Sequence, residues 1–228
     1  MKSAVRVALI GARGRMGQTI LDLAKNNPQI DIVAQCDLGD AIGAAMKDCD
    51  VAIDFSNASS IEEVCAAALQ HRKSLVVGTT GHSPQQRGLI EKAAESLPIV
   101  FASNFSVGVN VLFALTRRAA EILGAEFKPE IVETHHTKKK DAPSGTAKTL
   151  GEILKEKLKI DVPIESIREG DVVGEHTVAL VGASERLELT HSAGSREIFA
   201  SGALRAAQWV VGKSPGLYSM QDVLGISK

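Results

Sequence analysis

Short apolar runs alternate with helical stretches over the first hundred residues of the chain. The apolar runs lie at residues 5–10, 30–36, 51–55, 74–77 and 99–102. The first of them, residues 5–10, is typical of a parallel strand that is buried on both faces. The stretches at 16–25, 59–71 and 84–96 have helical character. This β-α-β alternation predicts an α/β fold with a Rossmann-like, doubly wound parallel sheet.

The pattern changes after Asn104. The predicted elements from there on are helices at 108–123 and around 147–158, strands at 129–133, 176–181 and 186–190, a helix at 196–211 and a short tail at 219–224. We therefore expect a dinucleotide-binding domain at residues 1–106 and a second, α+β domain at 107–202. The segment 203–228 is too short for a domain, so we expect it to pack back on the first one.

A glycine-rich turn separates the first predicted strand from the first predicted helix. It consists of Gly11, Ala12, Arg13, Gly14, Arg15, Met16 and Gly17. Glycine lets the backbone approach a pyrophosphate, and the helix start directs N–H groups toward it. Asp37 ends the second strand, where a carboxylate accepts hydrogen bonds from ribose hydroxyls. Because Arg13 replaces the second glycine of the usual motif, a tight turn in another β-α-β protein stays an alternative.

The residue after Asp37 bears on which dinucleotide binds. It is Leu38 rather than arginine, and Asp37 itself would repel the 2′-phosphate of NADPH. We therefore expect NADH to be preferred, although Arg13 or Arg15 could hold NADPH. Further nucleotide contacts are expected where the fourth and fifth strands end, at Gly78, Thr79, Thr80, Ala102, Ser103, Asn104 and Phe105. Both segments could instead be ordinary turns, with Asn104 as a local cap.

Two adjacent histidines and three lysines are concentrated between residues 133 and 146. A strand that ends at Glu133 and Thr134 would place His135 and His136 on opposite faces or at a bend. Histidine suits proton transfer near neutral pH, and a neighbouring lysine would hold an anionic substrate. The cluster therefore predicts a site for a small acidic substrate that needs a proton.

The end of this cluster has the form of a helix start. Ser144 is a good N-cap, and free N–H groups at Gly145 and Thr146 would make a carboxylate site. Three alternatives compete with a substrate site. The paired histidines could bind a metal, but no third ligand is evident nearby, so we expect none. The lysine run could be a solvated face or a phosphate patch, and nucleic-acid binding is improbable for three lysines in a neutral chain.

Composition narrows the class of protein. The chain has 228 residues, a net charge of −1, 44% hydrophobic and 4% aromatic residues, which gives no argument for nucleic acid or membrane as partner. No apolar run approaches the roughly 20 residues that span a bilayer, and the chain enters a strand pattern at its start. Cys36, Cys49 and Cys65 form no paired motif, so we expect a reduced cytoplasmic environment.

Several motifs together carry a family resemblance that covers essentially the whole chain. They are residues 11–17, Asp54-Phe55, residues 77–81 and 104–111, His135-His136 with Lys139 and Asp141 to Thr146, and residues 174–177 and 186–191. With these motifs the chain resembles the 4-hydroxy-tetrahydrodipicolinate reductases, or dihydrodipicolinate reductases, of bacterial lysine and diaminopimelate synthesis. The resemblance implies NAD(P)H-dependent reduction of a small cyclic dicarboxylate with loss of water. It also implies a homotetramer and a second domain for substrate binding and oligomerisation.

The resemblance also implies roles for individual residues. His135 would donate or accept a proton, and Lys139, the only lysine four residues from His135, would be the second proton donor. The expected substrate contacts are His136, Ser144, Gly145 and Thr146. The nucleotide would be lined by residues 11–16, Asp37, 78–80 and 102–105.

The chain departs from the family pattern in two loops. The link between Asp37 and Asp50 is short, and a stretch before Arg168 is missing. Two other functions compete with the reductase: a diamino-acid dehydrogenase on the same scaffold, and a nucleotide sensor without chemistry. The sensor would leave the histidine and lysine cluster unexplained.

Overall fold

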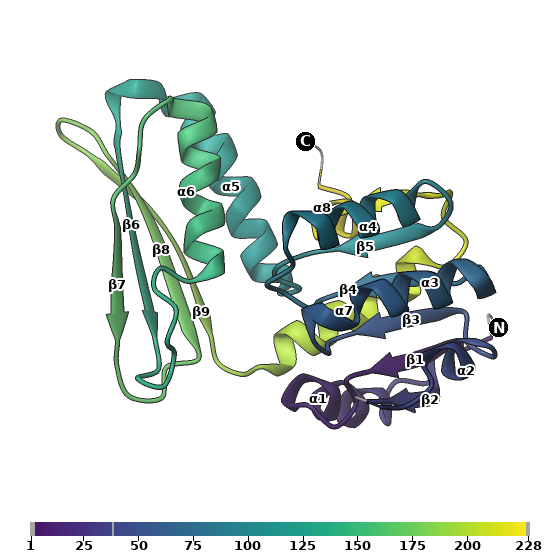
Figure 1. The fold of residues 1–228 in the computed structure, drawn as a ribbon. Helices are drawn as coiled ribbons and strands as arrows, with labels where there is room; N and C mark the ends of the chain where they lie inside the picture. Colours follow the sequence, from purple (N-terminus) through teal and green to yellow (C-terminus); the bar gives the residue numbers. More distant parts are fainter. Residues whose placement is uncertain (1–2, 38, 227–228) are drawn as a thin grey trace. The chain divides into compact units, whose positions relative to one another are not determined.

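The computed structural model describes residues 3–37 and 39–226, which form two compact units (Figure 1). The first unit contains the chain up to Phe105 and the segment from Glu197 onward, and the second runs from Ser106 to Arg196. The chain thus returns to the first unit at Glu197 rather than at residue 203. The reason is a single helix that begins at Glu197, because Ala200 on this helix is already buried in the core of the first unit.

The first unit is built on a six-stranded parallel sheet. Its strands, in spatial order, are β10 (Gly216–Tyr218), β5 (Pro98–Phe101), β4 (Ser74–Val77), β3 (Val51–Asp54), β1 (Val5–Ile10) and β2 (Ile30–Cys36). All neighbouring strands are parallel, which confirms the predicted doubly wound sheet. The strand order reverses at β1, which has β3 on one side and β2 on the other. Ligands of such sheets bind at the carboxyl ends of the strands beside this reversal.

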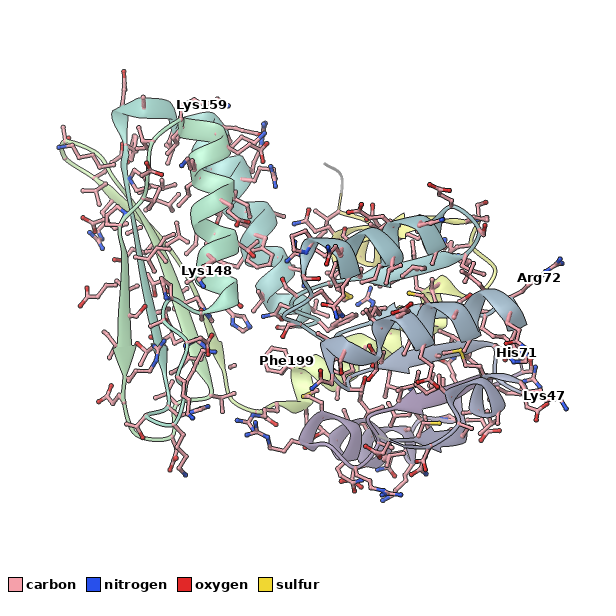
Figure 2. The ribbon with its side chains drawn as sticks, viewed as in Figure 1. Lys47, His71, Arg72, Lys148, Lys159 and Phe199 are labelled. Carbon is pink, nitrogen blue, oxygen red and sulfur yellow. The ribbon has the colours of Figure 1, made fainter. Side chains whose placement is uncertain are left out.

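Helices cover both faces of the sheet, which explains why the central strands β3 and β4 are buried at every position. In β1, Val7 and Leu9 face one core, while Ala8 and Ile10 face the other. The first core contains residues of α1 (Arg15–Ala24), α7 (Glu197–Val210) and α8 (Met220–Leu224). The second contains residues of α2 (Ile42–Met46), α3 (Ile61–His71) and α4 (Pro84–Ala94). A 3-10 turn, Ala58–Ser60, precedes α3, and Figure 2 labels His71 and Arg72 at the other end of that helix.

The second unit is a four-stranded mixed sheet with two helices on one face (Figure 1). Its strands, in spatial order, are β7 (Ile164–Arg168), β6 (Lys128–His135), β8 (Gly174–Val181) and β9 (Arg186–Ala193). β6 pairs with β7 in parallel, and the other pairs are antiparallel. The helices are α5 (Val107–Leu123), followed by a 3-10 turn (Gly124–Glu126), and α6 (Gly145–Leu158). Leu112, Phe113, Leu150 and Leu154 from these helices pack with Ile131 of β6 in one core.

The structure contains three short elements that the sequence pattern did not predict, namely α2, β7 and β10. β7 is the most consequential, because it brings Arg168 beside His135 through the parallel ladder with β6. Over residues 3–37 and 39–226, no helix combines the length and the apolar character needed to cross a membrane.

Candidate functional site

The glycine turn after β1 is a tight cradle that only glycine can form at two of its positions. Gly11 has φ of +84°, and a Cβ there would lie 2.4 Å from the carbonyl oxygen of Phe55. A Cβ on Gly17 would lie 2.2 Å from the carbonyl oxygen of Gly11, so α1 could not approach the turn. Gly14 is the N-cap of α1 and supplies no side-chain acceptor to its first N–H groups. The cradle therefore fits a nucleotide pyrophosphate.

Asp37 directly follows β2 and lies against this turn. Its carboxylate accepts a hydrogen bond from the backbone N–H of Arg13 at 2.8 Å. The guanidinium of Arg13 lies 3.8 Å from the same oxygen, with 81% of the side chain exposed. The backbone N–H groups of Gly11 and Ala12 both donate to the carbonyl of Cys36, which joins the ends of β1 and β2. A carboxylate at this place can bind ribose hydroxyls. Leu38, which the sequence analysis used to predict a preference for NADH, lies outside the described residues.

The two other predicted nucleotide segments also lie at the carboxyl edge of the sheet. Gly78 and Thr79 follow β4, and both backbone N–H groups donate to the carbonyl of Asp54 at the end of β3. A Cβ on Gly78 would lie 2.3 Å from the ring of Phe55. Among the remaining predicted residues, Thr80 and Ser103 are exposed, Ala102 and Asn104 are half-buried, and Phe105 is buried against Phe55.

Asp54, which the sequence analysis left without a role, organises this edge from inside. Its carboxylate is fully buried and accepts hydrogen bonds from the backbone N–H and the hydroxyl of Ser56. The N–H of Ser56 also donates to the hydroxyl oxygen of Thr79 at 3.0 Å. Burial raises the pKa of Asp54, and the hydrogen bonds from Ser56 oppose that rise.

In the second unit, β6 delivers Glu133 and His135 to the same buried side of the sheet. The two residues are two positions apart on one strand, so their side chains share a face. Glu133 is fully buried and His135 is 8% exposed. His136 follows the last residue of β6 and is half-buried. The two adjacent histidines thus differ in burial, with His135 at the end of the strand and His136 just after it.

The carboxylate of Glu133 connects three parts of this unit. One oxygen is hydrogen-bonded to Nδ1 of His135. The other accepts from Nη2 of Arg168 at 2.9 Å and from the backbone N–H of Ser144 at 3.2 Å. Burial alone would raise the pKa of Glu133, but the hydrogen bonds from Arg168 and His135 outweigh it and lower the pKa to about 2. Glu133 is therefore ionised at neutral pH.

His176 of β8 completes this buried group. Its ring meets the ring of His135 edge-on, with centroids 5.1 Å apart, and its Nε2 lies 3.1 Å from the hydroxyl of Ser144. Burial, with His135 second, lowers the pKa of His176 to about 4, so this ring is neutral at pH 7. Burial also lowers the pKa of His135, against the opposing effect of Glu133.

Of the three lysines, Lys139 is the one that belongs to this group. Its side chain is 21% exposed, and its Nζ lies 2.8 Å from the carboxylate of Asp141. Lys138 is 84% exposed, and Lys140 is also exposed. The solvated-surface interpretation of the lysine run thus applies to Lys138 and Lys140.

The start of α6 lies next to the same group, as predicted. Ser144 is its N-cap, and the hydroxyl accepts from the backbone N–H of Ala147 at 3.2 Å. Ser144 is 2% exposed, so it supports the helix start from within the protein. Gly145 is exposed, with open space where a Cβ would lie, and Thr146 is half-buried. Figure 2 labels Lys148 near this end of α6 and Lys159 just beyond its other end.

Sequence reasoning assigned no role to Glu133, Arg168 and His176. Glu133 had a local signal, because it shares a strand face with His135, but Arg168 and His176 come from strands whose pairing the pattern did not reveal. Glu133, His135 and His176 place one donor atom each within 4.8 Å of one another. The guanidinium of Arg168 is already bound to Glu133 and would repel a metal ion, while Glu133 is bonded to His135 and His176 to Ser144.

Two family models match the chain, one for each part. "Dihydrodipicolinate reductase, N-terminus" matches residues 5–105, and "Dihydrodipicolinate reductase, C-terminus" matches residues 108–224. A 4-hydroxy-tetrahydrodipicolinate reductase from Akkermansia muciniphila is 47% identical over 244 residues, covering 98% of this chain and 99% of its own. One from Geobacter metallireducens is 42% identical over 266 residues, covering 97% and 99%.

Solved structures share the fold at lower identity. A dipicolinate-bound dihydrodipicolinate reductase from Paenisporosarcina sp. TG-14 aligns with a TM-score of 0.82 and 23% identity, over 96% of this chain and 98% of its own. A DAP dehydrogenase from C. glutamicum, in complex with DAP, aligns with a TM-score of 0.61 and 16% identity, over 100% and 97%. The arrangement of a parallel sheet unit and a mixed sheet unit is therefore shared by enzymes of more than one activity.

Proposed function

This chain belongs to the dihydrodipicolinate reductase family, and we propose that it reduces 4-hydroxy-tetrahydrodipicolinate to tetrahydrodipicolinate. One hydride and one proton enter the ring, and one water leaves, as part of lysine and diaminopimelate synthesis. The observation that carries this proposal is the match of both family models, which together span nearly the whole chain. The buried Glu133–His135 pair beside Lys139 supports it, because the reduction requires a proton donor.

The first unit would hold the nicotinamide nucleotide. Residues 11–16 fit the pyrophosphate, since the glycine positions leave no room for a side chain there. Asp37 fits a ribose, and residues 78–80 and 102–105 would line the rest of the nucleotide at the sheet edge. When bound, NADH or NADPH supplies the hydride.

The second unit would hold the cyclic dicarboxylate and supply the proton. Gly145 and Thr146 would bind a carboxylate at the start of α6, and His136 would contact the substrate. Ser144 would act by orienting that helix start. His135 or Lys139 would transfer the proton. Imidazole suits proton transfer near neutral pH, and Lys139 is the least exposed lysine of the run.

NADH should be the preferred nucleotide. The carboxylate of Asp37 lies where a 2′-phosphate would be repelled, and the neighbouring cation, Arg13, is close enough to pair with that carboxylate. Arg13 would have to leave this position to bind a 2′-phosphate. Asp37→Ser should therefore raise the ratio of NADPH to NADH activity, whereas an unchanged ratio would contradict this assignment.

The test of the function is turnover with substrate made in the cuvette. A purified synthase converts pyruvate and aspartate semialdehyde to the substrate, and NADH or NADPH oxidation is followed at 340 nm. Omission of the synthase is the control. Tight NADH binding without turnover would refute the reductase and favour a sensor, and turnover of a diamino acid instead would favour the dehydrogenase.

We further propose a homotetramer in the cytoplasm, with no nucleic acid or membrane as partner. The helices α5 and α6 cover one face of the four-stranded sheet (Figure 1), and the opposite face carries Ile167, which is 37% exposed. A second copy could cover this face. The three cysteines are free and buried, which suits a reducing compartment. Light scattering on the purified protein tests the assembly, and a monomer would contradict it.

A further inference from the structure

Glu133 is an ionised carboxylate with no exposure to solvent, which is a costly group to keep inside a protein. On β6 it is paired in register with Ser166 of β7 and His176 of β8, and the guanidinium of Arg168 donates to its carboxylate. A structural ion pair for this strand already exists elsewhere, because Glu130 and Arg186 pair at the exposed end of β6, 3.1 Å apart. The buried carboxylate therefore calls for a reason other than strand pairing.

We propose that Glu133 and Arg168 are positioning residues that hold His135 and Lys139 together for proton transfer. Glu133 sets the orientation and tautomer of His135, and Arg168 ties the same carboxylate to the loop that carries Lys139. This inference deepens the proposed reductase function and rests on it.

The carboxylate of Glu133 fixes which ring nitrogen of His135 carries the hydrogen. An ionised carboxylate can only accept, so Nδ1 of His135 carries a hydrogen when it faces Glu133. The proton-transferring atom is then Nε2 in every turnover. Nε2 faces the backbone of Gly174 at the start of β8, where an added Cβ would lie only 3.0 Å away. The strand start thus leaves that nitrogen uncovered by a side chain.

Arg168 connects the carboxylate of Glu133 to the loop that carries Lys139. Its Nη2 donates to Glu133 at 2.9 Å and to the backbone carbonyl of Asp141 at 2.6 Å. The carboxylate of Asp141 in turn holds Nζ of Lys139. A continuous chain of hydrogen bonds therefore runs from His135 through Glu133, Arg168 and Asp141 to Lys139. Movement of the loop would disturb both proton-transferring groups at once.

The charges around His135 affect its pKa, which can be measured. The groups that face it are Glu133 on the same strand, Lys139 in the loop, Arg168 on β7 and His176 on β8. Burial lowers the pKa of His135, Glu133 opposes this, and Lys139 and Arg168 lower it further. Removal of the Glu133 charge should lower that pKa, and removal of the Arg168 charge should raise it.

The sign of the pH effect follows directly. A histidine that donates a proton loses activity as pH rises through its pKa. Glu133→Gln should therefore move the upper limb of the kcat/KM profile to lower pH, and Arg168→Gln should move it to higher pH. Glu133→Gln should lower kcat at pH 8 by about tenfold or more, because it removes the protonated donor there and general acid catalysis contributes about 10²–10⁴-fold. NADH affinity should stay unchanged, because both residues lie in the second unit.

The experiment compares these two variants with Glu130→Gln and Arg186→Gln, which break the exposed pair on the same strand. Steady-state profiles are measured with the synthase-coupled assay, and thermal melting reports stability. The inference is supported if Glu133→Gln and Arg168→Gln shift the upper limb of the kcat/KM profile in opposite directions, and the two control variants do not shift it. It is overturned if both lose activity equally at every pH, which a merely structural role would produce, or if neither changes.

Nitrogen NMR of labelled wild-type protein separates this inference from the function. The spectrum of His135, assigned by comparison with His135→Gln, should show hydrogen on Nδ1 in the neutral ring. This result does not require turnover or a folded Glu133 variant. Hydrogen on Nε2 in the neutral ring would refute the positioning role even in an active enzyme. Absence of reductase activity in wild-type protein with the Nδ1–H tautomer present would refute the function alone.

Discussion

Replacement of Gly17 by alanine tests whether the glycine turn is a nucleotide cradle. Its Cβ would lie 2.2 Å from the carbonyl oxygen of Gly11 and 2.6 Å from that of Ala12. Carbon and oxygen normally approach no closer than about 3.3 Å, so α1 would have to withdraw by roughly 1 Å. Forcing an extra carbon into a packed site costs about 1–3 kcal/mol, and the better helix propensity of alanine offsets at most about 1 kcal/mol.

The expected result is a net loss of about 1–2 kcal/mol in the free energy of unfolding. Because the cradle opens, NADH affinity should also fall by about tenfold or more, which is 1.4 kcal/mol of binding free energy. Urea unfolding measures the first quantity and NADH fluorescence titration the second. The matched control is Gly88→Ala on the exposed side of α4, where no atom lies within 4 Å of the added carbon.

Gly88→Ala should bind NADH normally and be stabilised by about 0.4–1 kcal/mol, through lower entropy of the unfolded chain and higher helix propensity. The reasoning fails if Gly17→Ala is as stable as wild type and binds NADH with equal affinity. Loss of stability without loss of affinity would show that the turn matters for packing but not for the nucleotide.

Four further changes test the second unit. His135→Ala should lower kcat by about 10²–10⁴-fold with little effect on NADH affinity; unchanged turnover would remove its assigned role. Lys139→Ala should lower kcat similarly, while Lys138→Ala should be near neutral, and the reverse order would show that the register of the motif is wrong. Gly174→Ala should lower kcat without weakening NADH binding, because its Cβ would press on Nε2 of His135; normal kcat would argue against Nε2 as the reacting atom. Acidification from about pH 6.5 to 4 should reduce the free energy of unfolding, because His176 has a folded pKa of about 4 and takes up its proton on unfolding; a pH-dependence in urea titrations that His176→Asn leaves unchanged would contradict this.

The elements predicted correctly from the sequence are those with strong local patterns. The predicted strands at 30–36 and 74–77 coincide with β2 and β4. β4 is buried at every position, so its side chains carry a strong local pattern. The unpredicted strands β7 and β10 are short. β7 alternates only between half-buried and exposed positions, and it is a strand because β6 pairs with it. Such pairing is a long-range interaction that no local window contains.

In the candidate site, too, the predictable residues are those with a local signal in the sequence. The glycine turn, the two histidines and the N-cap of α6 could be predicted because each acts through its own backbone position or its own chemistry. Asp37 was predictable from its spacing alone, and the structure adds the hydrogen bond from Arg13 that holds it at the turn.

Motifs in the sequence indicate which residues are suited to bind phosphate and transfer protons, since this chemistry belongs to single residues and short turns. The groups that surround His135 are set by the pairing of strands that lie far apart in the sequence. Glu133, Arg168 and His176 come together because three strands pair in one register, and Ser144 joins them because α6 starts there. Charge and burial at His135 depend on all of these neighbours at once, and so its proton affinity is a property of the fold.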